Sequence, residues 1–446
     1  MTMGEDRFTD ELSLAELAAQ PDRVLGKDAS ASALHYCSPA HGGWGMIRVA
    51  LLVPEVHLLF VCPAACGRHG AIAAIEQGCR DRITYLCIED REIVLGTYEA
   101  EIERAVGIIL GRLPARPRAL LIFVSCIDDL LGTDHDAALA RMEAAHGIPI
   151  RLARMNPISL GGSLPPGIRV QRSMYEFLEK APERDRGILI LGAYRPPPED
   201  SELGRFFAFC GYGPLRHPEF CRSFDDFKAL SRCAAALLVR PEGRAAGEDM
   251  VSRLDIPLCR SFMAFDREGI LERYGEIARF LGRPADDAAL EAWFRPGIEE
   301  VEAREEEARN LLGDASVAID STVTIAPFSL ALALVRGGIN VTRVYTDECP
   351  LFERGNLEKL TALRGDIIVA NPSHPRKYGP PAARADVAAG FEAGYATAAP
   401  VTVPLVFDEQ LYGFEGYARF LEALIRAVEK GQSSLREQIE EYGLVI

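Results

Sequence analysis

Short apolar runs alternate with amphipathic stretches along most of this chain. The first of these runs lie at 58–62, 83–88, 119–125 and 148–153, and helical periodicity separates them at 97–113 and 134–146. Continuous apolar strands joined by helices are typical of βαβ units, whose parallel sheets are covered on both faces. Asp134 suits the N-cap of the second of these helices, and Gly147 suits its C-cap. The pattern therefore predicts an α/β fold with parallel sheets.

The alternation continues in two further blocks. Strands are predicted at 187–192, 234–239 and near 256–258, then at 316–321, 340–346, 366–370 and 401–407, with a helix at 416–431 near the end. The charged stretch 286–312 is predicted to be a solvated helix that links two domains. A chain of 446 residues is too long for one hydrophobic core. We expect three Rossmann-like domains, at 1–185, 186–285 and 286–446, the last including the linker helix.

Charge and hydropathy exclude several classes of partner. The formal net charge is −16 and Lys and Arg form no block, so nucleic acid and anionic membranes are poor partners. The N-terminus is acidic and has no early apolar run, which does not fit a signal peptide. The most apolar stretch, 49–66, is interrupted by Pro54, Glu55 and His57 and is not expected to span a bilayer. We expect a cytoplasmic protein.

Nucleotide-binding motifs are missing from the sequence. It contains no Gly-x-x-x-x-Gly-Lys-Ser/Thr loop and no Gly-x-Gly-x-x-Gly after a predicted strand. The segment Gly42-Gly43-Trp44-Gly45 neither follows a strand nor has that spacing. We expect the chain itself neither to hydrolyse ATP nor to bind a dinucleotide in the usual way.

Three cysteines stand where predicted strands give way to loops: Cys37, Cys62 and Cys126. Carboxyl ends of parallel strands share one edge of a sheet, and thiolate is the ligand that iron–sulfur clusters take. Three ligands are one fewer than the usual four, which suggests a cluster shared with a second subunit. The alternative is that buried cysteines only fill space, and we interpret six others in this way: Cys79, Cys87, Cys210, Cys221, Cys233 and Cys259. A zinc site at Cys62, Cys66 and His69 lacks a second ligand pair nearby.

The segments around these cysteines resemble component 1 of the nitrogenase superfamily, most closely the β-type subunit of the molybdenum–iron protein. The resemblance is carried by Cys37-Ser38-Pro39, by Pro54-Glu55-Val56-His57 with Cys62, by Glu92-Ile93-Val94-Leu95-Gly96, and by Ser125-Cys126 with Leu131-Gly132-Thr133-Asp134. It is strong over residues 30–150 and only architectural beyond them. It implies three Rossmann-like domains, and it implies that Cys37, Cys62 and Cys126 are ligands of an iron–sulfur cluster between two subunits.

The sequence also departs from the family pattern. Leu58-Leu59-Phe60-Val61 replaces the glycine-containing turn before the second cysteine, and Cys66 follows closely enough to replace Cys62 or to add a thiolate. The segments that match those binding the catalytic cofactor in the α-type subunit, 237–241 and 401–407, contain no Cys and no His respectively. Dinitrogen reduction by this chain alone is therefore not expected, and a nitrogenase-like reductase acting on another substrate fits better.

Other polar residues are weaker candidates. Arg68 and His69 follow the second cysteine, where Arg68 could orient a substrate and His69 could donate a proton to it. For two larger sets we favour a structural role over a functional one. His35, His41, Trp44 and Arg48 beside the first cysteine could tune the cluster through hydrogen bonds, and Tyr194, Arg195, His217, Cys349, His374 and Arg376 could line a cavity.

The sequence thus predicts a subunit of a nitrogenase-like two-component reductase. The resemblance implies a separate ATP-dependent iron–sulfur reductase as electron donor, and an α-like subunit or a second copy of this chain as partner. The cluster is either an 8Fe-7S, P-cluster-like species or a 4Fe-4S cluster. Two alternatives remain open: a scaffold for metallocluster assembly, and a metal-free small-molecule-binding protein.

Overall fold

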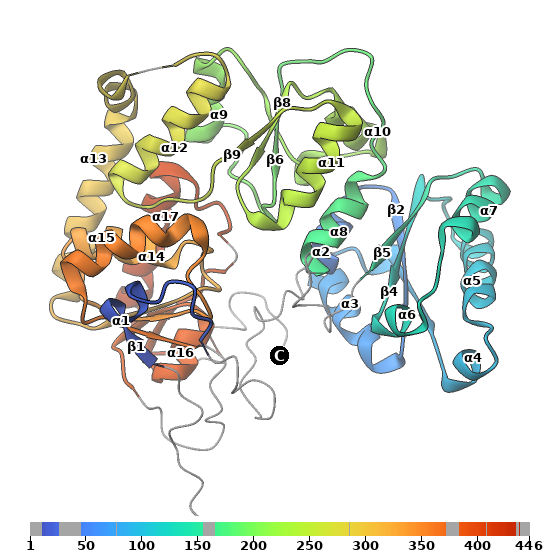
Figure 1. Ribbon diagram of the computed structural model, residues 1–446, viewed down its shortest axis with the longest axis horizontal. Coiled ribbons are helices and arrows are strands. Elements are labelled where there is room, and N and C mark those ends of the chain that lie inside the picture. The colour runs from blue at the N-terminus through green and yellow to red at the C-terminus, as the bar shows by residue number, and fades with distance from the viewer. Residues whose placement is uncertain are drawn as a thin grey trace, which may run out of the picture. The chain divides into compact units, whose positions relative to one another are not determined.

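The chain folds into α-helices and three largely parallel β-sheets, as predicted (Figure 1). The computed structural model describes residues 11–25, 46–76, 78–154, 166–284, 286–371, 383–406, 408–433 and 437. It divides into two compact units: unit 1 comprises 1–41, 197–210 and 261–446, and unit 2 comprises 42–196 and 211–260.

The first sheet of unit 2 has four parallel strands in the order β3-β2-β4-β5. They are β2 (Val56–Cys62), β3 (Ile83–Cys87), β4 (Ala119–Val124) and β5 (Ile150–Arg154). Every residue of the central strands β2 and β4 is buried, which explains why all of them except His57 are apolar. Helices α5 (Tyr98–Arg112) and α7 (Asp136–His146) cover one face, and α3 (Ala64–Glu76) packs against β2 and β3 on the other (Figure 1).

The second sheet of unit 2 is also parallel and has the order β7-β6-β8-β9. Its strands are β6 (Ile188–Leu191), β7 (Leu215–Arg216), β8 (Ala235–Leu238) and β9 (Leu258–Arg260). The other α-helices of unit 2 are α2 (Met46–Leu51), α4 (Asp90–Val94), α6 (Cys126–Leu131), α8 (Pro166–Tyr175), α10 (Phe224–Ala229) and α11 (Arg244–Leu254).

Unit 1 contains a six-stranded sheet in the order β1-β12-β11-β10-β13-β14. Its parallel strands are β10 (Val317–Asp320), β11 (Val341–Tyr345), β12 (Ile368–Ala370), β13 (Val387–Ala389) and β14 (Val401–Val403). The edge strand β1 (Glu11–Ser13) pairs antiparallel with β12, although it comes from the N-terminal part of the chain. The α-helices of unit 1 are α1 (Leu14–Ala18), α9 (Glu202–Phe209), α12 (Arg267–Phe280), α13 (Asp287–Leu312), α14 (Pro327–Arg336), α15 (Arg354–Arg364), α16 (Phe391–Thr397) and α17 (Gly413–Lys430).

Helix α13 corresponds to the charged stretch that the sequence predicted as a linker. Its start is capped by the Asp286 side chain, which accepts a hydrogen bond from the Ala289 amide at 2.8 Å. The helix is not solvated all round, because Leu290, Phe294 and Ile298 are buried on one face and α13 packs along α17 within unit 1. The charged residues occupy the remaining faces, which is the amphipathic pattern of a surface helix.

The two ends of helix α7 compare differently with the caps predicted from the sequence. Helix α7 begins at Asp136 and its N-cap is His135, so the assignment of Asp134 as N-cap is wrong, whereas Gly147 is the left-handed C-cap as predicted. The Asp134 carboxylate instead accepts a hydrogen bond from the Asp136 amide at 3.1 Å.

The domain boundaries at 185 and 285 stay a prediction. No helix among the described residues is long and apolar enough to cross a membrane.

Candidate functional site

The cysteines of the first sheet meet at the edge where its strands end. Cys62 is the last residue of β2, and Cys87 is the last residue of β3. Strand β4 ends at Val124, Ser125 is the N-cap of α6, and Cys126 is the first residue of that helix. The Ser125 amide donates to the Val61 carbonyl at 3.2 Å and holds the start of α6 beside the end of β2. Cys66 lies in the first turn of α3. We call these four residues the cysteine edge.

The Cys62 side chain lies on the face of the sheet that α3 covers. Phe60, two residues earlier on the same face, contacts Tyr85 with ring centroids 6.2 Å apart. A Cβ added at Gly67 of α3 would lie 3.8 Å from the Cys62 sulfur, so α3 passes directly over this thiol. Burial, with smaller contributions from the neighbouring Cys66 and Cys87, raises the pKa of Cys62 to about 12. The metal-free thiol is therefore protonated, and a metal would have to displace that proton.

Cys66 is close to two of the other thiols. Burial raises its pKa, and Cys126 is the next contributor to that rise. The structure thus brings Cys62, Cys66 and Cys126 together at one edge of the sheet. Cys62 and Cys126 are two of the three predicted ligands, and Cys66 is the predicted alternative to Cys62. Because both Cys62 and Cys66 are placed there, the choice between them stays open. Cys37, the third predicted ligand, lies outside the described residues.

The donors at the cysteine edge fit an iron–sulfur cluster in kind. Soft thiolates are the ligands that such clusters take, and all four cysteines are free of disulfide bonds. Within the described ranges, no group of three or more Cys, His, Asp or Glu side chains forms a site for a single metal ion. A single ion gathers its thiolates around one point, with metal–sulfur distances of about 2.3 Å for zinc, whereas a cluster holds them around a larger cage. The zinc site considered at Cys62, Cys66 and His69 is not tested by this finding, because the His69 side chain is not among those described.

A buried ionic network supports the helix that carries Cys126. Asp128 is fully buried, and one of its carboxylate oxygens lies 2.5 Å from Nε2 of the buried His135. The other oxygen pairs with Arg154, the last residue of β5. Arg154 also donates to the Thr133 carbonyl at 3.0 Å. These contacts tie α6 to the loop after it and to the edge strand, so they fix the position of Cys126. The sequence reasoning did not identify this network.

The other predicted residues either lie outside the described part of the chain or make structural contacts. Arg68 and His69 belong to α3, next to Gly67, but their side chains are not among those described. His35, His41, Trp44, His374 and Arg376 lie outside the described residues. His217 is structural: its Nε2 bonds to the Ala193 carbonyl at 3.1 Å, its Nδ1 accepts from the Glu219 amide, and burial lowers its pKa to about 4. The Arg48 guanidinium stacks on the Tyr194 ring, 4.3 Å from its centroid.

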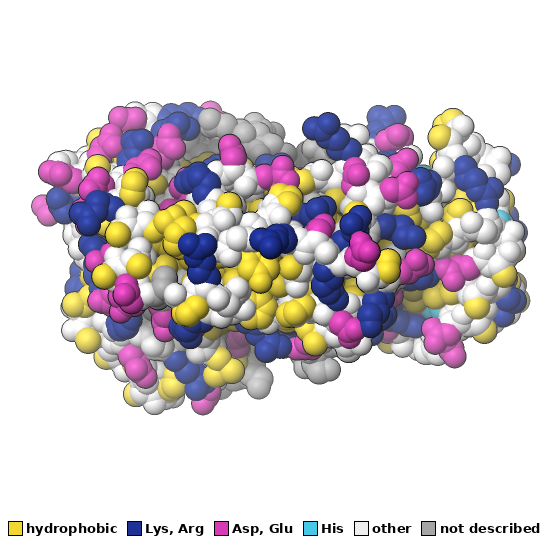
Figure 2. Space-filling model, turned by 90° about the horizontal axis from the view of Figure 1, so that it is seen from above, with side chains coloured by type: hydrophobic (Ala, Val, Ile, Leu, Met, Phe, Trp, Pro, Cys, Tyr) yellow, Lys and Arg dark blue, Asp and Glu magenta, His cyan; other side chains and the backbone are white. Residues whose placement is uncertain are grey.

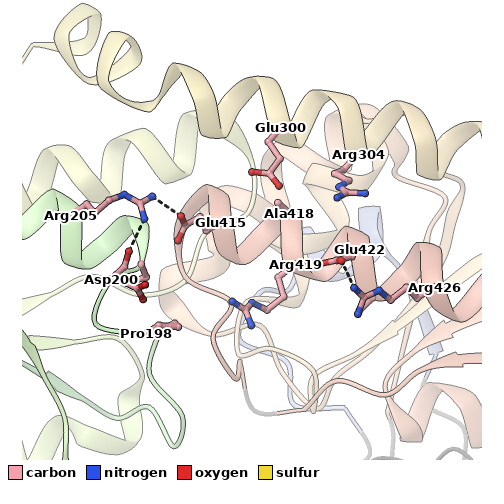
Figure 3. A pocket seen from close by; sticks show the side chains of 12 residues that line it. Pro198, Asp200, Arg205, Glu300, Arg304, Glu415, Ala418, Arg419, Glu422 and Arg426 are labelled. Carbon is pink, nitrogen blue, oxygen red and sulfur yellow. Dashed lines mark hydrogen bonds and ion pairs between the residues drawn. The ribbon is translucent and has the colours of Figure 1, made fainter. Parts of the chain in front are cut away.

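Unit 1 contains a polar pocket of about 540 Å³ among α9, α13 and α17 (Figure 3). Its charges are balanced, because Arg205 pairs with Glu415 and Arg426 pairs with Glu422. Arg419 donates to the Gln410 side chain at 2.5 Å. On the face in Figure 2, cationic and acidic side chains are likewise interspersed. The pocket therefore shows no single-sign charge that would select an ion, and we assign it no ligand.

The fold and the cysteine edge define an α/β protein with thiols gathered where parallel strands end. Comparison with known families identifies the family of this protein: residues 42–372 match the family described as nitrogenase component 1 type oxidoreductase. The chain belongs to this family, whose members are oxidoreductases that bind iron–sulfur clusters. The family resemblance inferred from the sequence is thereby confirmed, whereas a special closeness to the β-type subunit stays a prediction.

Solved structures show the same fold. A structure titled "Nitrogenase Cp1 at pH 6.5" aligns over 89% of this chain and 93% of its own, with a TM-score of 0.66 and 14% sequence identity. A second, titled "Nitrogenase Cp1 at pH 5", aligns over 89% of both chains with a TM-score of 0.61 and 12% identity. At such low identity these structures establish the architecture and not the substrate. A search of curated proteins found no match.

Proposed function

We propose that this chain is a subunit of a nitrogenase-like two-component reductase. It accepts low-potential electrons from a separate ATP-dependent iron–sulfur protein, through an iron–sulfur cluster at the boundary with a partner subunit, and reduces a substrate that is not dinitrogen. The observation that carries the proposal is the convergence of Cys62, Cys66 and Cys126 at one sheet edge in a member of this family. Cys37 is the third proposed ligand.

The chain's own residues would hold the cluster in a fixed, partly water-free setting. Cys62 is buried beneath α3, and Cys126 is fixed through Asp128, His135 and Arg154. When bound, such a cluster would accept and release single electrons, and burial and hydrogen bonds to its sulfurs help to set its potential. Arg68, His69 and His374 remain the proposed groups for substrate orientation and proton supply.

Exposed apolar side chains support the need for a protein partner. Two helices leave the cysteine edge, α4 shortly after β3 and α6 directly after β4. The end of α4 exposes Val94 and Leu95, at 82% and 66%, and α6 exposes Leu130 at 76%. Exposed large apolar side chains near the ends of both helices are candidates for protein–protein contact. The proposed occupants are the subunit that completes the cluster and the reductase that docks near it.

The proposal is tested by anaerobic purification of the full-length chain together with the subunits that co-purify. Iron, acid-labile sulfide and the electron paramagnetic resonance of the reduced sample are then measured. We expect iron and sulfide in comparable amounts, and a loss of most of both in Cys62→Ser and Cys126→Ser. Cys233→Ser is the matched control for Cys62→Ser, because Cys233 is as buried as Cys62 but precedes a strand of the second sheet. An iron-free protein, unchanged by these substitutions, would indicate the metal-free alternative.

Turnover separates the reductase from a scaffold. With the cognate reductase, ATP and a reductant, we expect continuous electron consumption that depends on Cys62 and Cys126. Transfer of the cluster to an acceptor protein in a single event, without continued consumption, would instead establish the assembly-scaffold alternative.

A further inference from the structure

The thiol of Cys87 lies beside Cys62 in a way that the sequence did not reveal. Strands β2 and β3 are parallel neighbours, and Cys62 and Cys87 are register partners at their carboxyl ends. Register partners on adjacent strands point to the same face of a sheet. The contact between Phe60 and Tyr85, which are partners two residues earlier, shows that this common face is the one that α3 covers. The two sulfurs therefore start from neighbouring backbone positions and project the same way.

Electrostatics and hydrogen bonding agree with this placement. The Cys87 thiol is one of the groups that influence the pKa of Cys62, so the two are within electrostatic reach. The Ile88 amide donates to the Cys62 carbonyl at 3.0 Å, which keeps the two strand ends paired up to their last residues. Cys62 is buried whereas Cys87 is exposed. A buried thiol and an exposed one, side by side, offer ligands at two depths of the same edge.

We propose that Cys87 is a further thiolate ligand of the iron–sulfur cluster at the cysteine edge. This inference rests on the proposed function, since it assumes that the edge binds such a cluster. It goes beyond that function in the ligand set: Cys62, Cys66, Cys87 and Cys126 are four thiols from a single chain. Four thiolates are the number that a four-iron cluster takes. Cys87 would then add one thiolate of this chain to the ligands at the boundary with the partner subunit.

The alternative role for Cys87 is that of an ordinary exposed cysteine at a strand end. A merely structural side chain would not be shielded by iron, would not alter the cluster's spectrum and would tolerate serine. The test therefore compares Cys87→Ser with Cys79→Ser. Cys79 belongs to the same sheet region but precedes β3, at the opposite end of that strand, and it is partly exposed.

The experiment uses the full-length protein, purified anaerobically with its co-purifying subunits, before and after removal of iron by a chelator. Alkylation of each cysteine by iodoacetamide is followed by peptide mass spectrometry, and iron content and electron paramagnetic resonance are recorded for each variant. We expect Cys87 to be alkylated at least fivefold more slowly in the iron-loaded protein. We also expect Cys87→Ser to shift the resonance and to lower iron retention, while Cys79→Ser behaves as the wild type.

The outcomes distinguish failure of the inference from failure of the proposed function. If Cys62 and Cys126 are shielded by iron but Cys87 is alkylated equally fast with and without it, and Cys87→Ser leaves the resonance unchanged, the inference is overturned and the cluster remains. If none of these cysteines is shielded and the wild type holds no iron, the proposed function fails and the inference fails with it.

Discussion

The Asp128 carboxylate and the His135 imidazole lie 2.5 Å apart in the interior of unit 2, and both side chains are buried. Asp128 is two residues from Cys126 on α6, a helix of six residues with no side-chain hydrogen bond at its N-cap. So short a helix is not stable by itself and depends on tertiary contacts. The pair between Asp128 and His135, with Arg154 on the other carboxylate oxygen, therefore supplies the contacts that hold the Cys126 backbone in place.

Replacement of Asp128 by alanine should loosen α6. The substitution leaves the Arg154 guanidinium and His135 without their buried partner, and removal of one member of a buried ion pair costs about 3–5 kcal/mol. We expect a clearly lower thermal midpoint and faster alkylation of Cys126 in the metal-free chain. Asp136→Ala, an exposed acidic residue at the start of α7, is the control and should change stability by about 0.5 kcal/mol or less. Equal midpoints for the two variants would contradict this role for Asp128.

Much of this site could be predicted from the sequence with one rule about parallel sheets. Apolar runs predicted the strands, and the rule that parallel strands end at a common edge placed Cys62 and Cys126 together. The same rule applied to Cys87, near the end of the run at 83–88, but its apolar context suggested simple packing. The network at Asp128 was missed for another reason. Its partners His135 and Arg154 are 7 and 26 residues away, and nothing local in the sequence links them.

Strand β1 shows a similar limit in the fold. It has three residues and pairs with β12, whose residues lie more than 350 positions further along the chain. Such a short segment has no detectable period, and only the tertiary structure decides where it pairs. Helix α13 shows the opposite case: its long charged sequence was sufficient to predict a helix over 286–312, although not the face that it buries.

The packing of α3 on the first sheet leads to a prediction about Gly70. A Cβ at this position would lie 3.1 Å from Phe60, 3.2 Å from Ile83 and 3.3 Å from Tyr85. Valine should therefore push α3 away from β2 and β3, at a cost of about 1–3 kcal/mol. The control is Gly111→Ala in α5, where an added Cβ meets nothing within 4 Å; it should stabilise the helix by about 0.5–1 kcal/mol. Thermal unfolding of the two variants measures both effects, and a neutral Gly70→Val would show that α3 does not pack as closely as described.

Glu353 leads to a prediction about pH. Its carboxylate is buried and accepts hydrogen bonds from the Phe328 and Ser329 amides at 2.7 and 3.0 Å. Burial raises its pKa from 4.5 to about 7. In the folded chain the carboxyl therefore keeps its proton to higher pH than in the unfolded chain. Its contribution to stability is complete below about pH 4.5, declines as the pH rises to about 7, and is constant above that.

The expected change for this one group is of the order of 3 kcal/mol between pH 4.5 and 7. Glu353→Gln keeps the shape and one acceptor but cannot ionise, so the thermal midpoint of this variant should fall less steeply over that range than that of the wild type. Glu202, whose pKa burial also raises to about 7, should add to the remaining slope. Parallel pH profiles for the wild type and Glu353→Gln would contradict the assignment.

The exposed end of α4 leads to the last prediction. Val94 and Leu95 are largely exposed at the end of α4, the helix that follows the strand ending in Cys87. A charge at either position should leave the monomer folded, since neither side chain is buried, but it should place an unpaired charge inside a protein–protein contact. We expect Val94→Glu and Leu95→Glu to weaken binding of a partner by at least tenfold, with an unchanged thermal midpoint. Val251→Glu on α11 is the control, because Val251 is also exposed, at 45%, but lies on a helix that packs with the second sheet. Co-purification and the reductase concentration at half-maximal electron transfer give the measurement. If all three variants bind the partner and accept electrons as the wild type does, the partner docks elsewhere and the apolar end of α4 has no part in the contact.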